Sequence, residues 1–147
     1  MTLTLRHAVA FVFLDLDDFK VLNDTHGHAV GDAILHTFGT ILQQLARQGD
    51  TIGRLGGEEF GWLLPGAAVP DAVMATERLL ATFRRAAADA GYPITCSAGV
   101  AVLPTATPAP LSAWDLGRLA DQALYQAKAT GKDRVVVTTT PDAGATG

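Results

Sequence analysis

The sequence predicts an α+β sandwich, with a central and mostly antiparallel sheet that is flanked by helices on at least one face. The main observation is the order of the segments along the chain, which alternate as strand, helix, hairpin, helix, strand, helix, strand. The second observation is the length: 147 residues are enough for one domain with a substantial core and too few for two ordinary domains. In such a domain, ligands bind at strand ends and in the connecting loops.

The first strand is expected at residues 8–14, where every side chain is apolar. This pattern suits a central strand that is covered on both faces. The strand would deliver Asp15 and Asp17 to its carboxyl end. Apolar side chains then recur at helical spacing from Val30 to Leu45, which predicts a helix that stops near Gly49.

A hairpin is expected next, with Gly56 and Gly57 as its turn. The glycine pair separates two strand-like runs, and both glycines can take positive φ, as the tightest hairpin turns require. Glu58 and Glu59 follow at once, so their side chains would face solvent or a ligand. Glutamates at a turn also serve simply to solubilise it, and the hairpin alone leaves both interpretations open.

The second half of the chain is expected to add two helices and two strands. In order, they are a helix from Pro70 to just before Gly91, a strand at 94–102, a helix capped by Ser112 that runs to Ala127, and a strand at 134–138. Residues 139–147 are rich in Thr, Gly and Ala and are expected to form a disordered tail. The single domain would therefore span residues 1–138.

Composition excludes several classes of partner. The net charge of −4 shows no electrostatic footprint for a nucleic-acid polymer or an anionic membrane surface. Cys96 is the single cysteine, which excludes an internal disulfide and fits a reducing compartment. The sequence shows neither a cationic leader nor an apolar run long enough to insert into a membrane. These observations predict a soluble cytoplasmic protein.

Acidic side chains are expected to converge where the first strand ends beside the hairpin tip. They are Asp15, Asp17, Glu58 and Glu59. Four neighbouring carboxylates repel one another unless a divalent cation neutralises them. Hard oxygen ligands select Mg²⁺ or Mn²⁺, and Mg²⁺ commonly takes one or two carboxylates together with substrate phosphates. The pattern therefore indicates metal-assisted phosphate chemistry; two unrelated acidic turns are the alternative.

Five separated motifs resemble the GGDEF family of diguanylate cyclases, in its GGEEF variant. They are residues 19–32, 56–60, 97–101, 120–128 and 131–132. The resemblance covers residues 8–137. It implies a fold similar to the palm of nucleotide cyclases and polymerases, with a ferredoxin-like βααββαβ core. It also implies a nucleotidyltransferase that condenses two GTP molecules into cyclic di-GMP and releases two pyrophosphates.

The resemblance implies roles for the residues at the acidic edge. Asp15, Glu58 and the backbone carbonyl of Leu16 match the family's ligands for two Mg²⁺ (or Mn²⁺) ions in each active site. Glu59 is the adjacent carboxylate, and either Glu58 or Glu59 would accept the proton of the ribose 3′-hydroxyl. Lys20 matches a residue that holds phosphate charge in the transition state, although a single loop lysine is more often only solvated.

Further matches concern the GTP-binding site. Asn23 and Asp32 match the residues that read guanine, whose N1–H and N2 amino donors adenine lacks. Asp32 also has a simpler explanation, because the helix macrodipole favours an acid in the first turn of a helix. Phe19 and Leu35 would line the base pocket or belong to the ordinary core. Gly56 and Gly57 would let the triphosphate lie close to the backbone.

Lys128 and Lys132 match the family's phosphate-binding pair near the end of the last helix. The macrodipole alone would also favour cations at that position. Lys132 departs from the family pattern, which more often has arginine, and it lacks the bidentate fork of a guanidinium. Because the charge is kept, we expect the phosphate contact to survive.

A second site is implied by Arg47 and Asp50, which match the family's Arg-x-x-Asp inhibitory motif. There cyclic di-GMP would bind away from the active site and inhibit its own synthesis. Arg78 resembles the secondary arginine that completes such a site across a dimer. Plain surface residues are the alternative for all three.

The sequence departs from the family at its beginning. The family carries a helix and a turn before the first strand, and here only residues 1–7 precede it. We expect either a fragment or a short stand-alone domain. Each domain would hold one GTP, so catalysis would need a homodimer. A catalytically inactive receptor for cyclic di-GMP or GTP, and another two-metal nucleotidyl cyclase, remain as alternative functions.

Overall fold

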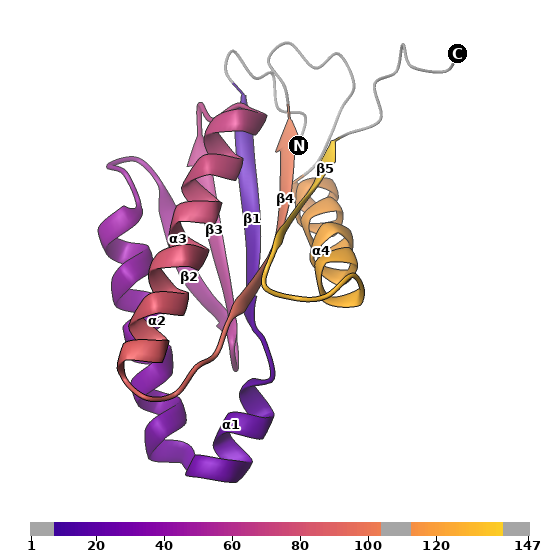
Figure 1. Cartoon of the computed structure of the whole chain (residues 1–147). Coiled ribbons are helices and arrows are strands. Elements are labelled where there is room, and N and C mark those ends of the chain that lie inside the picture. The colour runs from indigo at the N-terminus through magenta and orange to yellow at the C-terminus, as the bar shows by residue number, and fades with distance from the viewer. Residues whose placement is uncertain (1–7, 104–112, 140–147) are drawn as a thin grey trace.

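The computed structural model describes residues 8–103 and 113–139 of the chain. Its strands form one sheet in the order β2-β3-β1-β4-β5, in which only β4 and β5 are parallel (Figure 1). The predicted α+β fold with a mostly antiparallel sheet is confirmed. The strand bounds are β1 Val9–Leu16, β2 Thr51–Gly56, β3 Glu59–Pro65, β4 Cys96–Leu103 and β5 Val135–Thr139.

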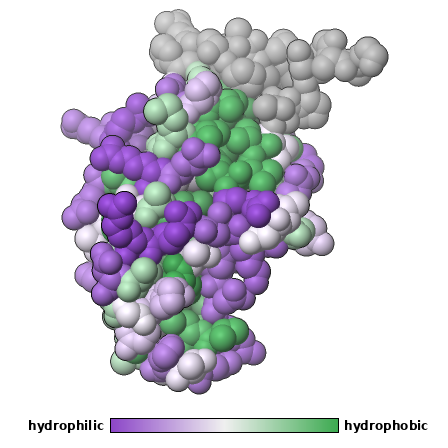
Figure 2. All heavy atoms as spheres, in the orientation of Figure 1, coloured by the Kyte–Doolittle hydropathy of each residue, from purple (hydrophilic) through white to green (hydrophobic). Residues whose placement is uncertain are grey.

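Helices cover both faces of the sheet. Their bounds are α1 Phe19–His26, α2 His28–Leu45, α3 Val69–Asp89 and α4 Ala113–Ala129. The helices α2 and α3 lie on one face and α4 lies on the other (Figure 1). Figure 2 shows that the surface over α2 and α3 is mostly hydrophilic. No helix among the described residues is long and apolar enough to cross a membrane.

The strand β1 occupies the centre of the sheet, but its two faces are not equally covered. Ala10, Val12 and Leu14 are fully buried in the core beneath α2 and α3. Phe11 and Phe13 point to the other face, where they pack beside α4 and stay partly exposed. The expected burial of this strand on both faces is therefore wrong for the second face. In the described part of the chain, α4 is the one helix on that face, and it covers only part of it.

The short helix α1 was not expected as a separate element. It buries only Phe19 and Leu22, so it is too short for helical periodicity to stand out in the sequence. Gly27 separates it from α2 with φ 89, a conformation that favours glycine. The helix α2 thus begins two residues before the expected start at Val30 and ends at Leu45, where the apolar run ends and four residues before the expected stop near Gly49.

Gly99 in β4 is the point where α4 comes closest to the sheet. A Cβ atom added there would overlap the carbonyl oxygen of Ala120 and the amide nitrogen of Leu124. Strand and helix therefore pack backbone to backbone, which only glycine permits. This close approach sets the position of α4, whose last turn carries Lys128.

Candidate active site at the end of the central strand

The structure brings the end of β1 and the hairpin tip together. Asp15 lies between Glu59 on β3 and Ser97 on β4 in the strand register. Burial raises the pKa of Asp15, and the nearby charge of Glu58 adds to the rise, although Lys128 opposes it. Burial also raises the pKa of Glu59, and the charges of Asp15 and Glu58 add to it. Three predicted site carboxylates therefore share one electrostatic environment.

The turn of the hairpin differs from the expected one. Because β2 ends at Gly56 and β3 begins at Glu59, the turn residues are Gly57 and Glu58. Neither Gly56 nor Gly57 is among the described glycines with positive φ, so that expectation is wrong. A register shift between Arg54 and Gly56 bends the strand instead, and the Arg54 Nε donates to the Gly57 carbonyl oxygen at 2.8 Å.

Gly57 has open space where a side chain would lie. A Cβ atom added there would meet nothing within 4 Å, and one at Gly56 would approach only the Glu59 carboxylate, at 3.7 Å. Neither the backbone conformation nor the packing of the chain thus requires glycine at these positions. The open space leaves room for a ligand to lie against the turn.

Lys128 lies among oxygen atoms at the strand end. Its Nζ donates to Asp15 at 2.8 Å and to Asp17 at 2.7 Å, and lies 3.5 Å from the Leu16 carbonyl oxygen. Burial acts to lower the pKa of Lys128, but the hydrogen bonds to Asp15 and Asp17 outweigh it and raise the pKa. Lys132, the other predicted phosphate-binding lysine, pairs with Asp18 at 2.8 Å. Sequence reasoning did not anticipate these carboxylate partners.

Asp17 lies near enough to Asp15 for its charge to help raise the pKa of that carboxyl but, unlike Glu58 and Glu59, it is buried and hydrogen-bonded within the chain. It is 2% exposed. Its oxygens accept hydrogen bonds from the Thr95 and Ser97 hydroxyls at 2.7 Å, from Lys128, and from the Asp133 N–H at 3.1 Å. Burial acts to raise the pKa of Asp17, but the bonds from Lys128, Ser97 and Thr95 outweigh it and lower the pKa. The chain itself therefore satisfies this carboxylate.

The oxygens around Asp15 fit a hard divalent cation. No group of three or more His, Cys, Asp or Glu side chains among residues 8–103 and 113–139 is arranged to hold a metal ion. The Lys128 ammonium, however, shows that the Asp15 carboxylate and the Leu16 carbonyl can face one cation together. Two carboxylates, one carbonyl and the phosphates of a substrate form a ligand set that suits Mg²⁺. Asp15, Leu16 and Glu58, the predicted metal ligands, would supply the protein part of such a set.

The residues predicted to read the base lie on α1 and α2. The Oδ1 of Asn23 is buried and has no hydrogen-bond partner among the residues that the structure describes. It lies against Gly31, where any Cβ atom would overlap it, and the Phe19 ring borders the same point at 3.1 Å. A buried acceptor without a donor is costly, so this oxygen is an exception that calls for an explanation. Phe19 and Leu35 are both buried in the main core.

Asp32 and Lys20 are exposed and have no partner in the described part of the chain. Because α2 begins at His28 and has no acid in its first turn, the macrodipole does not account for Asp32. Both side chains are therefore available to a ligand.

Comparison with known proteins decides the family. The sequence profile described as "Diguanylate cyclase, GGDEF domain" matches residues 2–134. The chain belongs to the GGDEF family. GGDEF diguanylate cyclases are generally metal-dependent, which agrees with the oxygen atoms gathered at the end of β1.

Individual relatives agree with this assignment. Diguanylate cyclase DgcS of Shewanella oneidensis is 36% identical over 126 residues, which cover 86% of this chain and 41% of DgcS. The active GGEEF domain of a diguanylate cyclase from Vibrio cholerae is 31% identical, with a TM-score of 0.78 and coverage of 90% of this chain and 83% of that one. The GGDEF domain of DgcB from Caulobacter crescentus, solved with c-di-GMP, is 28% identical, with a TM-score of 0.76 and coverage of 88% and 77%. The chain spans less than half of the length of the curated relatives it matches.

This GGDEF domain has a second set of predicted residues away from the strand end. Arg47 and Arg78 line one cavity of about 270 Å³ between α2, β3 and α3. Asp50 lies beside it, and its Oδ2 accepts from the Arg47 N–H at 2.9 Å and from the Trp62 indole N–H at 3.0 Å. The structure thus brings Arg47 and Arg78 together within one chain. Sequence reasoning did not single out Trp62, which is 1% exposed.

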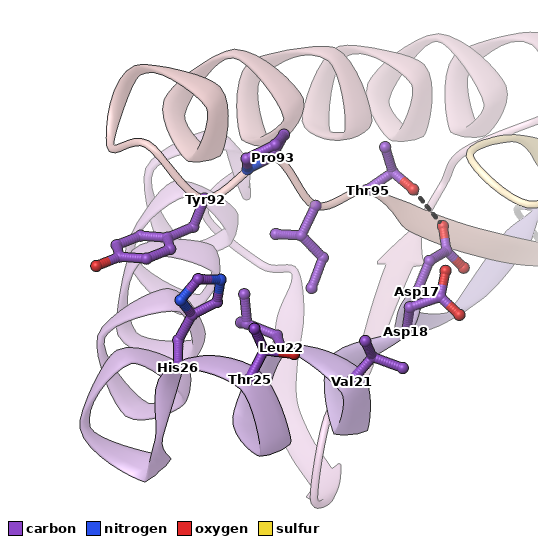
Figure 3. A pocket seen from close by; sticks show the side chains of 10 residues that line it. Asp17, Asp18, Val21, Leu22, Thr25, His26, Tyr92, Pro93 and Thr95 are labelled. Atoms are coloured by element: carbon purple, nitrogen blue, oxygen red, sulfur yellow. Dashed lines mark hydrogen bonds between the residues drawn. The ribbon is translucent and has the colours of Figure 1, made fainter.

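A further cavity of about 310 Å³ borders the strand end between α1 and residues 92–95 (Figure 3). Asp17 and Asp18 lie at one end of it and His26 and Tyr92 at the other. The two rings meet edge to face at 4.9 Å, so His26 serves packing. None of the predicted base-reading residues lines this cavity.

Proposed function

We propose that this GGDEF domain condenses two GTP molecules into cyclic di-GMP and releases two pyrophosphates. Each subunit of a homodimer would hold one GTP. The observation that supports this best is the shared environment of Asp15, Glu58 and Glu59 beside Lys128, at the end of a palm-like central strand. The functions given in the names of DgcS and of the Vibrio cholerae domain support the same chemistry.

Guanine would bind between α1 and α2. The unpartnered Oδ1 of Asn23 and the free carboxylate of Asp32 would accept hydrogen bonds from the N1–H and N2 amino group of the base. Adenine has no matching donors, so the same contacts would exclude ATP. Gly31 is essential to this arrangement, because it leaves room for the Asn23 amide.

The triphosphate would lie against the open turn at Gly57, with its charge held by Lys20 and Lys132. A divalent cation bound by Asp15, Glu58 and the Leu16 carbonyl would supply charge neutralisation to the phosphates. The ribose 3′-oxygen of one GTP attacks the α-phosphorus of the other, and the bond to pyrophosphate breaks. Glu59 would take the 3′-hydroxyl proton, since its raised pKa favours proton uptake. The same step, repeated with the roles exchanged, closes the ring.

The direct test is to incubate the domain with GTP and Mg²⁺ and to separate the nucleotides by chromatography. We expect cyclic di-GMP and two equivalents of pyrophosphate, and none with ATP. Glu59→Gln should lower turnover by about 10²–10⁴-fold while GTP binding is kept. Asp89→Asn, which changes an exposed acid at the end of α3, is the matched control. GTP binding without product at any protein concentration would instead support an inactive receptor.

We also propose that the cavity lined by Arg47 and Arg78 binds the product. Two guanidinium groups suit the two phosphates of cyclic di-GMP, and Asp50 suits a guanine edge. The complex of the DgcB domain with c-di-GMP supports product binding in this family. Calorimetry with cyclic di-GMP should show that Arg47→Ala loses this binding. The exposed control variant Arg85→Ala should bind cyclic di-GMP as the wild type does. Unchanged binding in Arg47→Ala would place the product elsewhere.

A further inference from the structure

The connection between α4 and β5 holds an unfavourable backbone conformation. Lys132 has φ 63 and Asp133 has φ 49, two successive residues in the left-handed region that side chains other than glycine rarely adopt. Such residues cost free energy and persist only where surrounding contacts hold them. The contacts that hold this loop are therefore informative.

Arg84 on α3 contacts the loop through Asp133, in addition to the Lys132 N–H bond to the Ala127 carbonyl oxygen and the Lys132–Asp18 pair. Its Nε lies 3.1 Å and 3.0 Å from the two Asp133 oxygens, and its terminal nitrogen donates at 2.7 Å. The hydrogen bonds to Asp133 raise the pKa of the guanidinium. Bidentate pairs of this geometry bind more strongly than ordinary surface ion pairs. The neighbouring Arg85 is exposed and makes no ion pair among the described residues.

From Asp133 the contacts continue to the strand end. The Asp133 N–H donates to the buried Asp17 carboxylate at 3.1 Å. Asp17 in turn holds Lys128 at 2.7 Å, and Lys128 contacts Asp15 at 2.8 Å. A shift of the loop would remove one of the donors to Asp17 and let this carboxylate turn away from the orientation in which it meets Lys128.

We propose that Arg84 is a positioning residue for the active site. Its ion pair with Asp133 keeps the loop in the left-handed conformation, so that the Asp133 N–H stays on Asp17 and Asp17 keeps Lys128 against Asp15. The consequence for nucleotide binding rests on the proposed cyclase function. The effect on Lys128 itself does not, and it can be measured without nucleotide.

The first experiment measures the environment of Lys128 directly. Trace acylation of the folded domain, followed by mass spectrometry, gives the labelling rate of Lys128 relative to the exposed Lys20. We expect Arg84→Gln to raise this ratio about threefold or more, in line with the loss of a charge-assisted contact, and Arg85→Gln to leave it unchanged. Because Lys20 is already exposed, general loosening of the fold would raise the ratio too, and an unchanged thermal unfolding midpoint of Arg84→Gln excludes that explanation. An unchanged ratio in a folded Arg84→Gln would overturn the proposal.

A double-variant cycle tests whether Arg84 acts through Asp133. Asp133→Asn keeps a residue that tolerates positive φ but removes the charge. Arg84→Gln should change the labelling ratio much less in this background than in the wild type. Equal effects in both backgrounds would show that Arg84 acts by another route and would overturn the proposal.

The last experiment measures binding of 3′-deoxy-GTP, which lacks the attacking hydroxyl, with Mg²⁺ present. Because Lys128 contacts the same Asp15 and Leu16 oxygens as the proposed cation, we expect Arg84→Gln to change the affinity about three- to tenfold, Arg84→Lys to change it less, and Arg85→Gln to match the wild type. If the wild type binds no analogue, the proposed function fails, while the labelling ratio still decides the role of Arg84. If the wild type binds and Arg84→Gln binds equally well, the active-site role of Arg84 is overturned.

Discussion

At the end of β1 every buried charge has a partner within the chain, whereas beside Gly31 a buried acceptor has none. Asp17 accepts from two hydroxyls, an ammonium and a backbone N–H, and Lys128 balances Asp15 and Asp17 together. The Oδ1 of Asn23 has no donor among residues 8–103 and 113–139. Burying an unpaired charge costs several kcal/mol, whereas an unpaired neutral acceptor costs about 1–3 kcal/mol. A folded domain can therefore leave an amide oxygen free for a ligand more easily than a buried carboxylate.

The largest expected effect on stability comes from removing the paired charges at the end of β1. Asp17→Ala leaves Lys128 with one carboxylate and orphans the Thr95 and Ser97 hydroxyls, so it should lower the free energy of unfolding by about 3–5 kcal/mol. Asp32→Ala changes an exposed residue next to Gly31 and should change the free energy of unfolding by less than about 0.5 kcal/mol. Urea denaturation measures both. Similar losses of unfolding free energy in the two variants would contradict the contrast between the end of β1 and the region beside Gly31.

The next effect comes from filling the space beside Asn23. In Gly31→Ala, the added methyl group overlaps the Asn23 amide, so this variant should lose about 1–3 kcal/mol of stability. It should also raise the KM for GTP, because the amide must move. Gly117→Ala in α4 is the control, since nothing lies within 4 Å of its Cβ position. That variant should be neutral or slightly stabilised, by up to about 1 kcal/mol. An unchanged KM for GTP in Gly31→Ala would show that Asn23 does not contact the base.

Removal of the free acceptor should affect recognition more than stability. Asn23→Ala deletes an oxygen that has no partner in the described part of the chain, so the unfolding free energy should hardly change. The preference for GTP over inosine triphosphate, which lacks the 2-amino group, should fall about 5- to 100-fold, the value of one good hydrogen bond to a base. Competitive binding measures this ratio. A ratio equal to that of the wild type would assign guanine recognition to other residues.

The smallest expected effect is on the pH dependence of stability. The pKa of Asp15 is raised above 3.8 in the folded state, so the folded state takes up this proton first and stability rises as pH falls towards 3.8. The pKa of Asp17 is lowered below 3.8, so its contribution is present above 3.8 and is lost as pH falls further. Thermal unfolding in a metal-free buffer should therefore show a melting temperature that passes through a maximum as pH is lowered. Asp17→Asn should remove the loss on the acid side, and an unchanged acid side would contradict this assignment.

Local patterns predicted most of the elements. Helical periodicity and end signals placed α2, α3 and α4, because these signals lie within each segment. The helix α1 was missed, since only Phe19 and Leu22 of it are buried. The hairpin was found, but its turn falls one residue later than expected, because the Arg54–Gly57 hydrogen bond and a register shift close it instead of positive φ at both glycines.

The candidate site was predicted as a set of residues and not as a set of contacts. Spacing along the chain identified Asp15, Glu58, Glu59, Asn23 and Lys128 together, because the family retains these motifs in a fixed order. Their roles in GTP binding and catalysis remain predictions. The partners of Asp17 and Lys128 were not predicted, since nothing local to either residue indicates which way it turns.

The sequence by itself determined the fold class, the family and the identity of the acidic hairpin, because residue type, periodicity and motif order are written along the chain. Only the tertiary structure decided which charges are paired within the molecule. Arg84 and Asp133 lie 49 positions apart, and Asp17 and Lys128 lie 111 apart. Contacts over such separations depend on how α3 and α4 pack against the sheet. The strength of a charge pair depends on ångström-scale distance and burial, which no local pattern encodes.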